Sequence, residues 1–145
     1  MSIVFTNGVF DAGLHCGHFK LLRFCEQLVG EDGKLFIALD SDKKVKKDKG
    51  SNRPIFTFEE RKRSIEILDL KNLEEIYCFN TNKELLDLIK KCNAEVVVKS
   101  EEWKNNVVGS SVAKVVYFNV LKGFSTSKIV ERVLEKYRYD LSEPA

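Results

Sequence analysis

The sequence lacks several features that would place it in a membrane, secreted or zinc-binding class. No apolar run approaches the roughly 20 residues that a membrane-spanning helix needs. The N-terminus lacks the basic start, long apolar segment and small-residue cleavage site of a signal peptide. The four cysteines form no CxxC pair and have no histidine at zinc-finger spacing. We therefore expect a soluble cytoplasmic protein with reduced thiols.

Three motifs of widespread enzyme families are also missing. The chain has no GxSxG nucleophile elbow, no GxxxxGK[ST] phosphate loop and no GxGxxG dinucleotide fingerprint. Serine hydrolases, P-loop enzymes and dinucleotide-fold dehydrogenases are therefore disfavoured. The formal net charge of +2 is too small to indicate binding to nucleic acid by itself.

What the sequence does contain is a regular alternation of two patterns. With 145 residues, of which 43% are hydrophobic and 32% charged, it has the size of one globular domain spanning residues 1–145. Short apolar runs predict strands at 3–5, 35–39, 75–79, 96–98 and 115–118. Helical spacing of apolar residues separates them. This alternation predicts an α/β fold with a Rossmann-like, doubly wound, five-stranded parallel sheet and helices on both faces.

The segment from Thr6 to His18 joins the first expected strand to the first expected helix. Open α/β sheets bind ligands at such crossings. Both histidines of the chain, His15 and His18, lie here with Gly17 between them, and a helix N-terminus attracts phosphate. Metal binding is disfavoured because no third ligand is evident. A purely structural role at the start of the helix remains an alternative.

Two further segments carry groups that bind anions. Five lysines lie within residues 43–49, in a stretch from Asp42 to Pro54 without apolar periodicity, which predicts a loop after the second strand. Ser125, Thr126 and Ser127 precede the last expected helix and offer hydroxyls and free N–H groups there. A solvated loop and an ordinary helix cap are the alternatives. In the predicted sheet, both segments lie at the same edge as the histidines.

Other candidate residues occur singly. Glu102 and Trp103 follow the fourth expected strand and suit hydrogen bonding to, and stacking on, a nucleoside, although a surface turn is the alternative. Arg61 lies in a helix that begins with the capping-box pair Thr57 and Glu60. A guanidinium suits bidentate phosphate contacts, but an exposed helix position is also possible for it.

Taken together, these motifs resemble a known family. Residues 6–18, Ser41-Asp42, Lys49-Gly50, Arg53-Pro54, Arg61 and residues 123–129 occur in the order seen in the HxGH-motif nucleotidyltransferase superfamily, in its cytidylyltransferase-like family. The chain is most similar to the adenylyltransferase domain that activates heptose 1-phosphate, and next to the glycerol-3-phosphate cytidylyltransferases. It departs from both in having three residues, not two, between Asp11 and His15, and in having Ser100 after Lys99 in place of a glycine.

The resemblance implies an enzyme that joins a nucleoside monophosphate from an NTP to a phosphorylated small molecule and releases pyrophosphate. ATP is the favoured NTP and a sugar 1-phosphate, such as heptose 1-phosphate, the favoured acceptor. A cytidylyltransferase for glycerol, choline or ethanolamine phosphate, an FAD synthase, and a nucleotide-binding module without turnover are the alternatives. The resemblance also implies Mg²⁺, as the metal–NTP complex, and a homodimer, with neither nucleic acid nor membrane as partner.

The resemblance further implies roles for particular residues. The catalytic set is His15, His18, Lys46, Lys49 and Asp11, with Asp11 also a possible indirect Mg²⁺ ligand. Nucleotide contacts are expected from the backbone of Gly8, Val9 and Phe10, and from Gly17, Glu102, Trp103, Ser125 and Thr126. Arg61 and Lys46 are expected to bind the acceptor phosphate. We expect Gly13 to absorb the extra residue, because glycine adopts backbone conformations closed to other residues.

Overall fold

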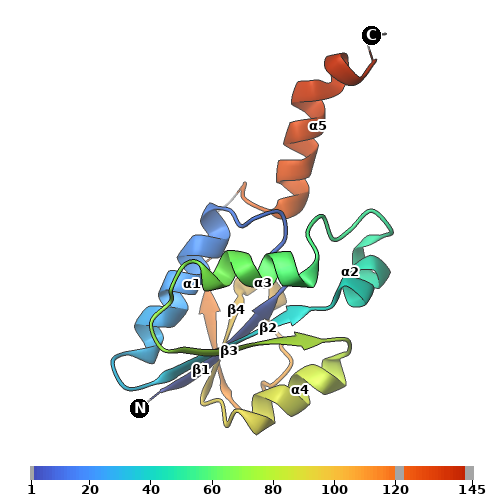
Figure 1. The fold of residues 1–145 in the computed structure, drawn as a ribbon. Coiled ribbons are helices and arrows are strands. Elements are labelled where there is room, and N and C mark those ends of the chain that lie inside the picture. Colours follow the sequence, from blue (N-terminus) through green and yellow to red (C-terminus); the bar gives the residue numbers. More distant parts are fainter. Residues whose placement is uncertain (1, 120–122, 143–145) are drawn as a thin grey trace.

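The computed structural model describes residues 2–119 and 123–142, and within them strands and helices alternate as predicted (Figure 1). The elements in chain order are β1 (Ile3–Gly8), α1 (Cys16–Val29), β2 (Lys34–Asp40), α2 (Asp42–Lys49), α3 (Phe58–Glu66), β3 (Leu73–Phe79), α4 (Asn82–Lys91), β4 (Val96–Ser100), the 3-10 helix η1 (Glu101–Trp103), β5 (Lys114–Phe118) and α5 (Thr126–Ser142). All five predicted strands are confirmed.

The five strands form one parallel sheet in the order β3-β2-β1-β4-β5. This confirms the predicted Rossmann-like fold. The pairing of β1 with β2 continues to Gly8 and Leu39, whereas its pairing with β4 ends at Thr6 and Val98. The sheet therefore opens between β1 and β4 at its carboxyl edge. After β1, successive strands are added on one side of it (β2, then β3), and from β4 on they are added on the other side. Ligands bind at this switch point in such folds.

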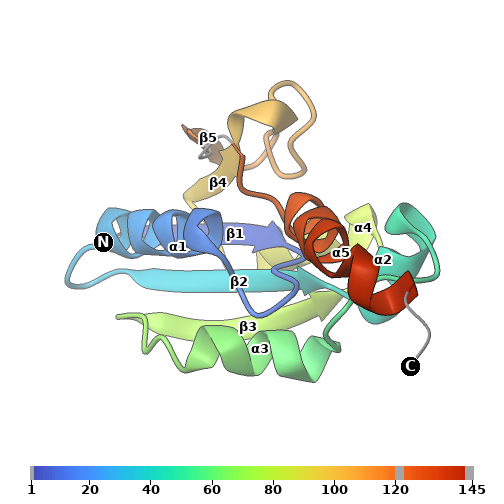
Figure 2. The ribbon, with the colours of Figure 1, turned by 90° about the horizontal axis from the view of Figure 1, so that it is seen from above.

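Helices cover both faces of the sheet, each over its own apolar core. Leu22 and Cys25 of α1 and Ile65 of α3 pack with Val4 and Ile37 on one face. On the other face, Leu85 and Ile89 of α4 pack with Phe5, Ala38 and Val97. The central strands β1, β2 and β4 are buried from both sides, which is why they read as continuous apolar runs. Seen from above in Figure 2, β1 and β2 point toward the side of the molecule where α2 and α5 begin.

The loop predicted from Asp42 to Pro54 is wrong over residues 42–49, which form helix α2, and is confirmed over residues 50–54. The Ser41 hydroxyl caps this helix by accepting a hydrogen bond of 3.1 Å from the Lys44 N–H. The Lys44 ammonium binds Asp48, one turn further along the helix, at 2.7 Å, and Asp40, the last residue of β2, at 2.9 Å. Only Val45 of the helix is buried, and one apolar residue cannot produce a detectable period.

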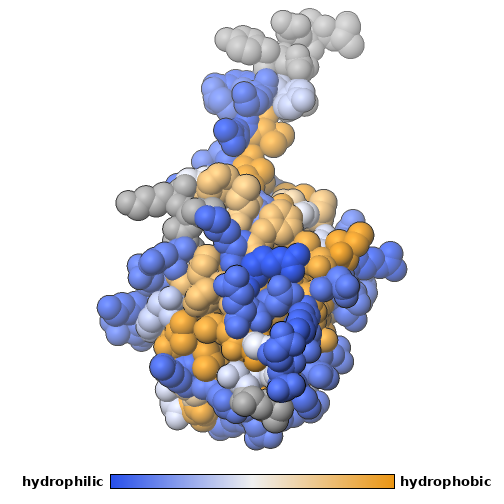
Figure 3. All heavy atoms as spheres, turned by 90° about the vertical axis from the view of Figure 1, so that its left-hand side faces the viewer, coloured by the Kyte–Doolittle hydropathy of each residue, from blue (hydrophilic) through white to orange (hydrophobic). Residues whose placement is uncertain are grey.

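Helix α5 extends away from the rest of the molecule (Figure 1). Val133, Leu134 and Tyr137 on it are 51%, 55% and 57% exposed, which is unusual for a helix of a single folded domain. Figure 3 shows hydrophobic surface continuing from the body onto the base of this projection. Within residues 2–119 and 123–142, no helix combines the length and apolarity required to cross a membrane.

Candidate active site

A cavity of about 550 Å³ lies at the carboxyl edge of the sheet, where β1 and β4 separate. It brings together eleven of the residues predicted from the sequence: Gly8, Val9, Phe10, His15, Gly17, His18, Lys49, Glu102, Trp103, Ser125 and Thr126. Three other predicted residues, Asp11, Lys46 and Arg61, are not in its wall. Segments from both ends of the chain therefore meet in one site.

The two histidines form a reciprocal cap at the start of α1. His15 is the N-cap residue, and its Nδ1 accepts a hydrogen bond of 3.0 Å from the Gly17 N–H. His18 returns the contact, since its Nδ1 accepts from the His15 N–H at 3.2 Å. The two rings are stacked with centroids 3.7 Å apart. Because each Nδ1 is an acceptor, a neutral ring carries its proton on Nε2, where it can donate to a ligand.

Burial keeps both imidazoles neutral at physiological pH. It lowers the pKa of His18 to about 3, with a smaller contribution from the neighbouring His15, against the opposing charge of Asp11. It also lowers the pKa of His15. The pair therefore offers two oriented N–H donors and no positive charge before an anion arrives. Donors fixed in this way need little reorganisation when negative charge develops beside them.

Gly17 is required by the packing of this pair. A Cβ atom at position 17 would lie 2.9 Å from Cε1 of His15, which is closer than real Cβ contacts. Packing also favours glycine at position 8, because a Cβ there would lie 3.0 Å from the ring of Phe10. The spacing of the HxGH motif thus follows from the close contact between the first histidine ring and the backbone of the helix.

The turn that leads into α1 contains the extra residue and is strained. Gly13 has a φ of 78°, as predicted, but Phe10, Ala12 and Leu14 also have positive φ values of 52°, 58° and 72°. Each non-glycine residue in this region costs on the order of 1–3 kcal/mol and persists only where its surroundings hold it. The turn is therefore held by strong tertiary contacts.

Asp11 supplies those contacts. Its side chain is fully buried, and each oxygen accepts two hydrogen bonds: Oδ1 from the N–H groups of Ala12 (2.7 Å) and Phe56 (2.8 Å), Oδ2 from the Ile55 N–H (2.7 Å) and the Arg53 guanidinium (3.1 Å). Burial by itself would raise the pKa of the carboxyl, but these donors hold it below its usual value.

The predicted role of Asp11 as an indirect Mg²⁺ ligand does not fit this arrangement, because both oxygens are enclosed by protein donors. In the described part of the chain, no group of three His, Cys, Asp or Glu side chains is placed to hold a metal ion. These residues therefore do not build a site for a resident metal. Asp11 instead joins the strained turn to residues 53–56.

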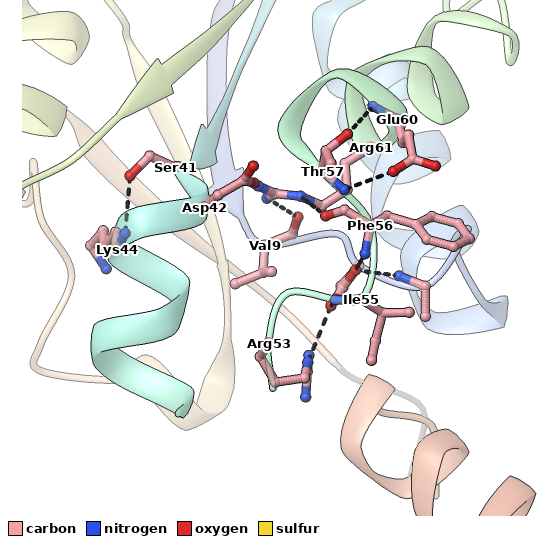
Figure 4. A network of polar contacts seen from close by, with 12 residues as sticks. Val9, Ser41, Asp42, Lys44, Arg53, Ile55, Phe56, Thr57, Glu60 and Arg61 are labelled. Carbon is pink, nitrogen blue, oxygen red and sulfur yellow. Dashed lines mark hydrogen bonds and ion pairs between the residues drawn. The ribbon is translucent and has the colours of Figure 1, made fainter. Parts of the chain in front are cut away.

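Arg61 is not part of the cavity wall and lies in a buried polar network with Val9, Asp42 and Phe56 (Figure 4). Its side chain is 0% exposed. The guanidinium donates to the carbonyl of Val9 at 2.9 Å, to the carbonyl of Phe56 at 3.1 Å and to Asp42 at 2.7 Å. The predicted contact with acceptor phosphate therefore does not fit this conformation. Arg61 connects the turn after β1 to α2, and these partners explain why a buried arginine is tolerated.

The lysines of α2 divide into two groups. Lys44 and Lys49 line the cavity, whereas Lys43, Lys46 and Lys47 lie outside its wall. The sequence prediction of Lys46 and Lys49 as a catalytic pair therefore has structural support only for Lys49. It missed Lys44, although the i,i+4 spacing of Lys44 and Asp48 is a sequence signal for a helical ion pair. It also missed the contribution of Arg53, which lines the cavity and contacts Ser127 at 3.3 Å.

The residues at the beginning of α5 form another part of the cavity wall. The Ser125 hydroxyl accepts a hydrogen bond of 3.1 Å from the Lys128 N–H, which confirms the predicted cap. Ser125, Thr126 and Ser127 all line the cavity, together with Phe124. The N-termini of α1 and α5 thus border one cavity, and each favours negative charge.

Comparisons with known proteins agree with this geometry. A family model described as Cytidylyltransferase-like matches residues 5–139. The Bifunctional protein HldE of Campylobacter jejuni subsp. doylei is 35% identical over 136 residues, which are 92% of this chain and 28% of that protein. The protein of the same name from Helicobacter hepaticus is 37% identical over 133 residues, covering 90% of this chain and 26% of its own length. Most of each relative therefore lies outside the match.

Solved structures show the same fold. The lipopolysaccharide core biosynthesis protein from Thermoplasma volcanium GSS1 superposes with a TM-score of 0.62 at 18% identity, over 84% of this chain and 99% of that one. Since the family model and the sequence relatives each cover about nine-tenths of the chain or more, the protein belongs to the cytidylyltransferase-like family of nucleotidyltransferases.

Proposed function

We propose that the protein transfers AMP from ATP to a sugar 1-phosphate, with heptose 1-phosphate the first candidate, and releases pyrophosphate. The observation that carries this proposal is the meeting of two helix N-termini, the histidine pair and Lys49 in one cavity. Such a cavity suits two phosphate-bearing substrates at once. The identity of 35–37% to proteins named HldE, together with the resemblance to heptose 1-phosphate adenylyltransferase domains, favours this substrate pair.

In the proposed reaction, a phosphate oxygen of the acceptor attacks the α-phosphorus of ATP. A new P–O bond forms, the bond between the α-phosphorus and the bridging oxygen breaks, and the electron pair leaves with pyrophosphate. The acceptor phosphate has a second pKa of about 6 and is already ionised at neutral pH, so no protein base is needed. The barrier is the approach of two anions, and positioning and charge stabilisation must lower it.

The residues of the cavity wall divide this work. His15 and His18 donate Nε2–H bonds to the transferring phosphate, and the N–H groups of Gly8 to Phe10 lie beside it. Ser125 and Thr126 at the start of α5 hold the β- and γ-phosphates. Lys49 approaches the acceptor phosphate. Mg²⁺ would enter as part of the nucleotide substrate, whose phosphates would hold it.

The test of this proposal is pyrophosphate release with ATP, CTP and GTP, each paired with heptose 1-phosphate, glycerol 3-phosphate, phosphocholine and FMN. We expect the highest kcat/KM for ATP with heptose 1-phosphate. CTP with an alcohol phosphate would indicate the cytidylyltransferase alternative, and ATP with FMN the FAD synthase alternative. Nucleotide binding without pyrophosphate release in any pair would indicate a binding module.

Two of the exposed lysines of α2, Lys46 and Lys49, provide an internal comparison. We expect Lys49→Met to lower kcat/KM by about tenfold, because a charge at the cavity wall offsets repulsion between the substrates by roughly 1.4 kcal/mol. Lys46→Met removes the same charge from the same helix outside the cavity and should stay within about twofold of the wild type. Steady-state kinetics of both variants decide the point. Equal losses would indicate a general electrostatic effect of the helix.

The expected homodimer also remains a proposal, and α5 is the surface we assign to it. Its exposed apolar residues Val133, Leu134 and Tyr137 need cover, and the helix carries charged residues of both signs, so two antiparallel copies can place unlike charges beside each other. We expect sedimentation equilibrium to give twice the chain mass of 16.6 kDa for the wild type and the chain mass for Leu134→Lys. A monomeric wild type, or a Leu134→Lys variant that stays dimeric, would contradict this interface.

A further inference from the structure

Lys99 lies at the carboxyl end of β4, and the roles assigned above do not include it. Its ammonium donates to the carbonyl of Asn7 at 3.2 Å. The same nitrogen stands 4.8 Å from the centre of the Trp103 ring, and both side chains line the cavity. Since strand pairing between β1 and β4 ends at Thr6 and Val98, Lys99 bridges the two strands at the first position where they part.

The surroundings of Lys99 act on its charge in opposite directions. Burial lowers its pKa to about 8, the carboxylates of Asp40 and Glu102 oppose that shift, and Lys44 adds to it. The group is therefore mainly an ammonium at neutral pH and loses its charge in mildly alkaline solution. An ammonium has three N–H groups, and the hydrogen bond to the Asn7 carbonyl uses one of them.

We propose that Lys99 is a positioning residue, which holds Trp103 as a stacking platform for the base of the bound nucleotide and thereby favours purines over pyrimidines. The inference rests on the proposed function in one respect, namely that the cavity binds a nucleoside triphosphate. A cation on one face of an indole fixes the orientation of the ring. Trp103 is 47% exposed, so the ring remains accessible to a base. A purine covers more of an indole than a pyrimidine does, and stacking grows with overlap.

The chain offers a direct probe, because Trp103 is its only tryptophan. Excitation selective for tryptophan reports on Trp103 alone. In the wild type without nucleotide, we expect the intensity of this fluorescence to change between about pH 6 and pH 10, with a midpoint of about 8. Lys99→Met should abolish this transition, and Lys99→Arg should move it above the range. Lys104→Met is the matched control, since Lys104 is exposed, follows Trp103 in the chain and lies outside the cavity wall. Trp103 fluorescence in this variant should show the same pH transition as in the wild type.

With nucleotide, the same fluorescence measures affinity. We expect Lys99→Met to raise the Kd for ATP by about tenfold, the effect of one lost base-stacking contact, and that for CTP by less than about twofold. Lys99→Arg should recover most of the ATP affinity, because arginine also stacks on an indole face. Circular dichroism confirms that each variant is folded. An unchanged ratio of ATP to CTP affinity in Lys99→Met, or an alkaline transition that survives it, overturns the inference.

The outcome also separates this inference from the proposed function. If the wild type binds ATP and releases pyrophosphate while Lys99→Met keeps the wild-type nucleotide preference, only the role of Lys99 is wrong. If the wild type binds no nucleoside triphosphate, both proposals are wrong. A pH transition in Trp103 fluorescence that depends on Lys99 would then show only that the two side chains are in contact.

Discussion

His18→Ala is expected to reduce turnover by at least about a hundredfold, the scale of losing one preorganised donor to the transition state. The reason is the position of its Nε2–H, which the capping contact of its Nδ1 with the His15 N–H holds toward the cavity. The loss should appear in kcat more than in KM, because the donor matters most when charge develops on the transferring phosphate. Single-turnover kinetics with saturating ATP measure it.

The variant also removes a helix cap, so a second substitution is needed to separate the two effects. A glutamine at the third position of a helix can accept the hydrogen bond of the N-cap backbone, as the His18 ring does. His18→Gln should therefore restore the stability lost in His18→Ala, which we place at about 1 kcal/mol. It should not restore turnover. Full activity in His18→Gln would show that His18 serves the helix and not the chemistry.

Asp11→Ala is expected to destabilise the fold by about 3–5 kcal/mol, the cost of removing one partner from a buried ion pair. The substitution leaves the Arg53 guanidinium and the N–H groups of Ala12, Ile55 and Phe56 without their acceptor. It also releases the strained turn before His15. Urea unfolding followed by circular dichroism gives the free energy. Wild-type stability combined with an altered Mg²⁺ dependence of turnover would instead assign Asp11 to the metal.

The same carboxylate has a predictable pH signature. Its pKa in the folded protein lies below its ordinary value of 3.8, so the stability that it contributes is complete above that value. This contribution is lost as the pH falls through the folded-state pKa. Unfolding midpoints of wild type and Asp11→Ala should therefore converge in acid and stay apart at neutral pH. A constant difference across the whole range would contradict the assignment.

Much of the fold could be predicted because its strands are buried on both faces. Runs such as 35–39 and 96–98 are apolar at every position, and that pattern belongs to central parallel strands. Helix α2 could not be predicted in this way. It buries one residue, Val45, and is stabilised by a cap and by ion pairs, which leave no apolar period in the sequence.

The predictable part of the site is the part made by neighbouring residues. His15, Gly17 and His18 contact one another within one helical turn, and Ser125 caps the helix that follows it. The roles of Asp11 at the metal and of Arg61 at the substrate rest on the family resemblance, and the sequence does not show their actual contacts because the partners are distant in the chain. Ile55 lies 44 residues after Asp11, and Val9 lies 52 residues before Arg61. Lys99 and Asn7 are 92 residues apart, so that contact was equally hidden.

The central claim is that one cavity transfers a nucleotidyl group between two phosphate-bearing substrates. Phosphorus-31 NMR of the wild type with MgATP and heptose 1-phosphate tests it most directly, because the product contains a new phosphate–phosphate linkage. We expect two coupled resonances of an ADP-linked sugar to grow together with pyrophosphate, and neither to appear with His18→Ala on the same time scale. Growth of ADP and inorganic phosphate, or unchanged ATP in the presence of every acceptor tested, would contradict the claim.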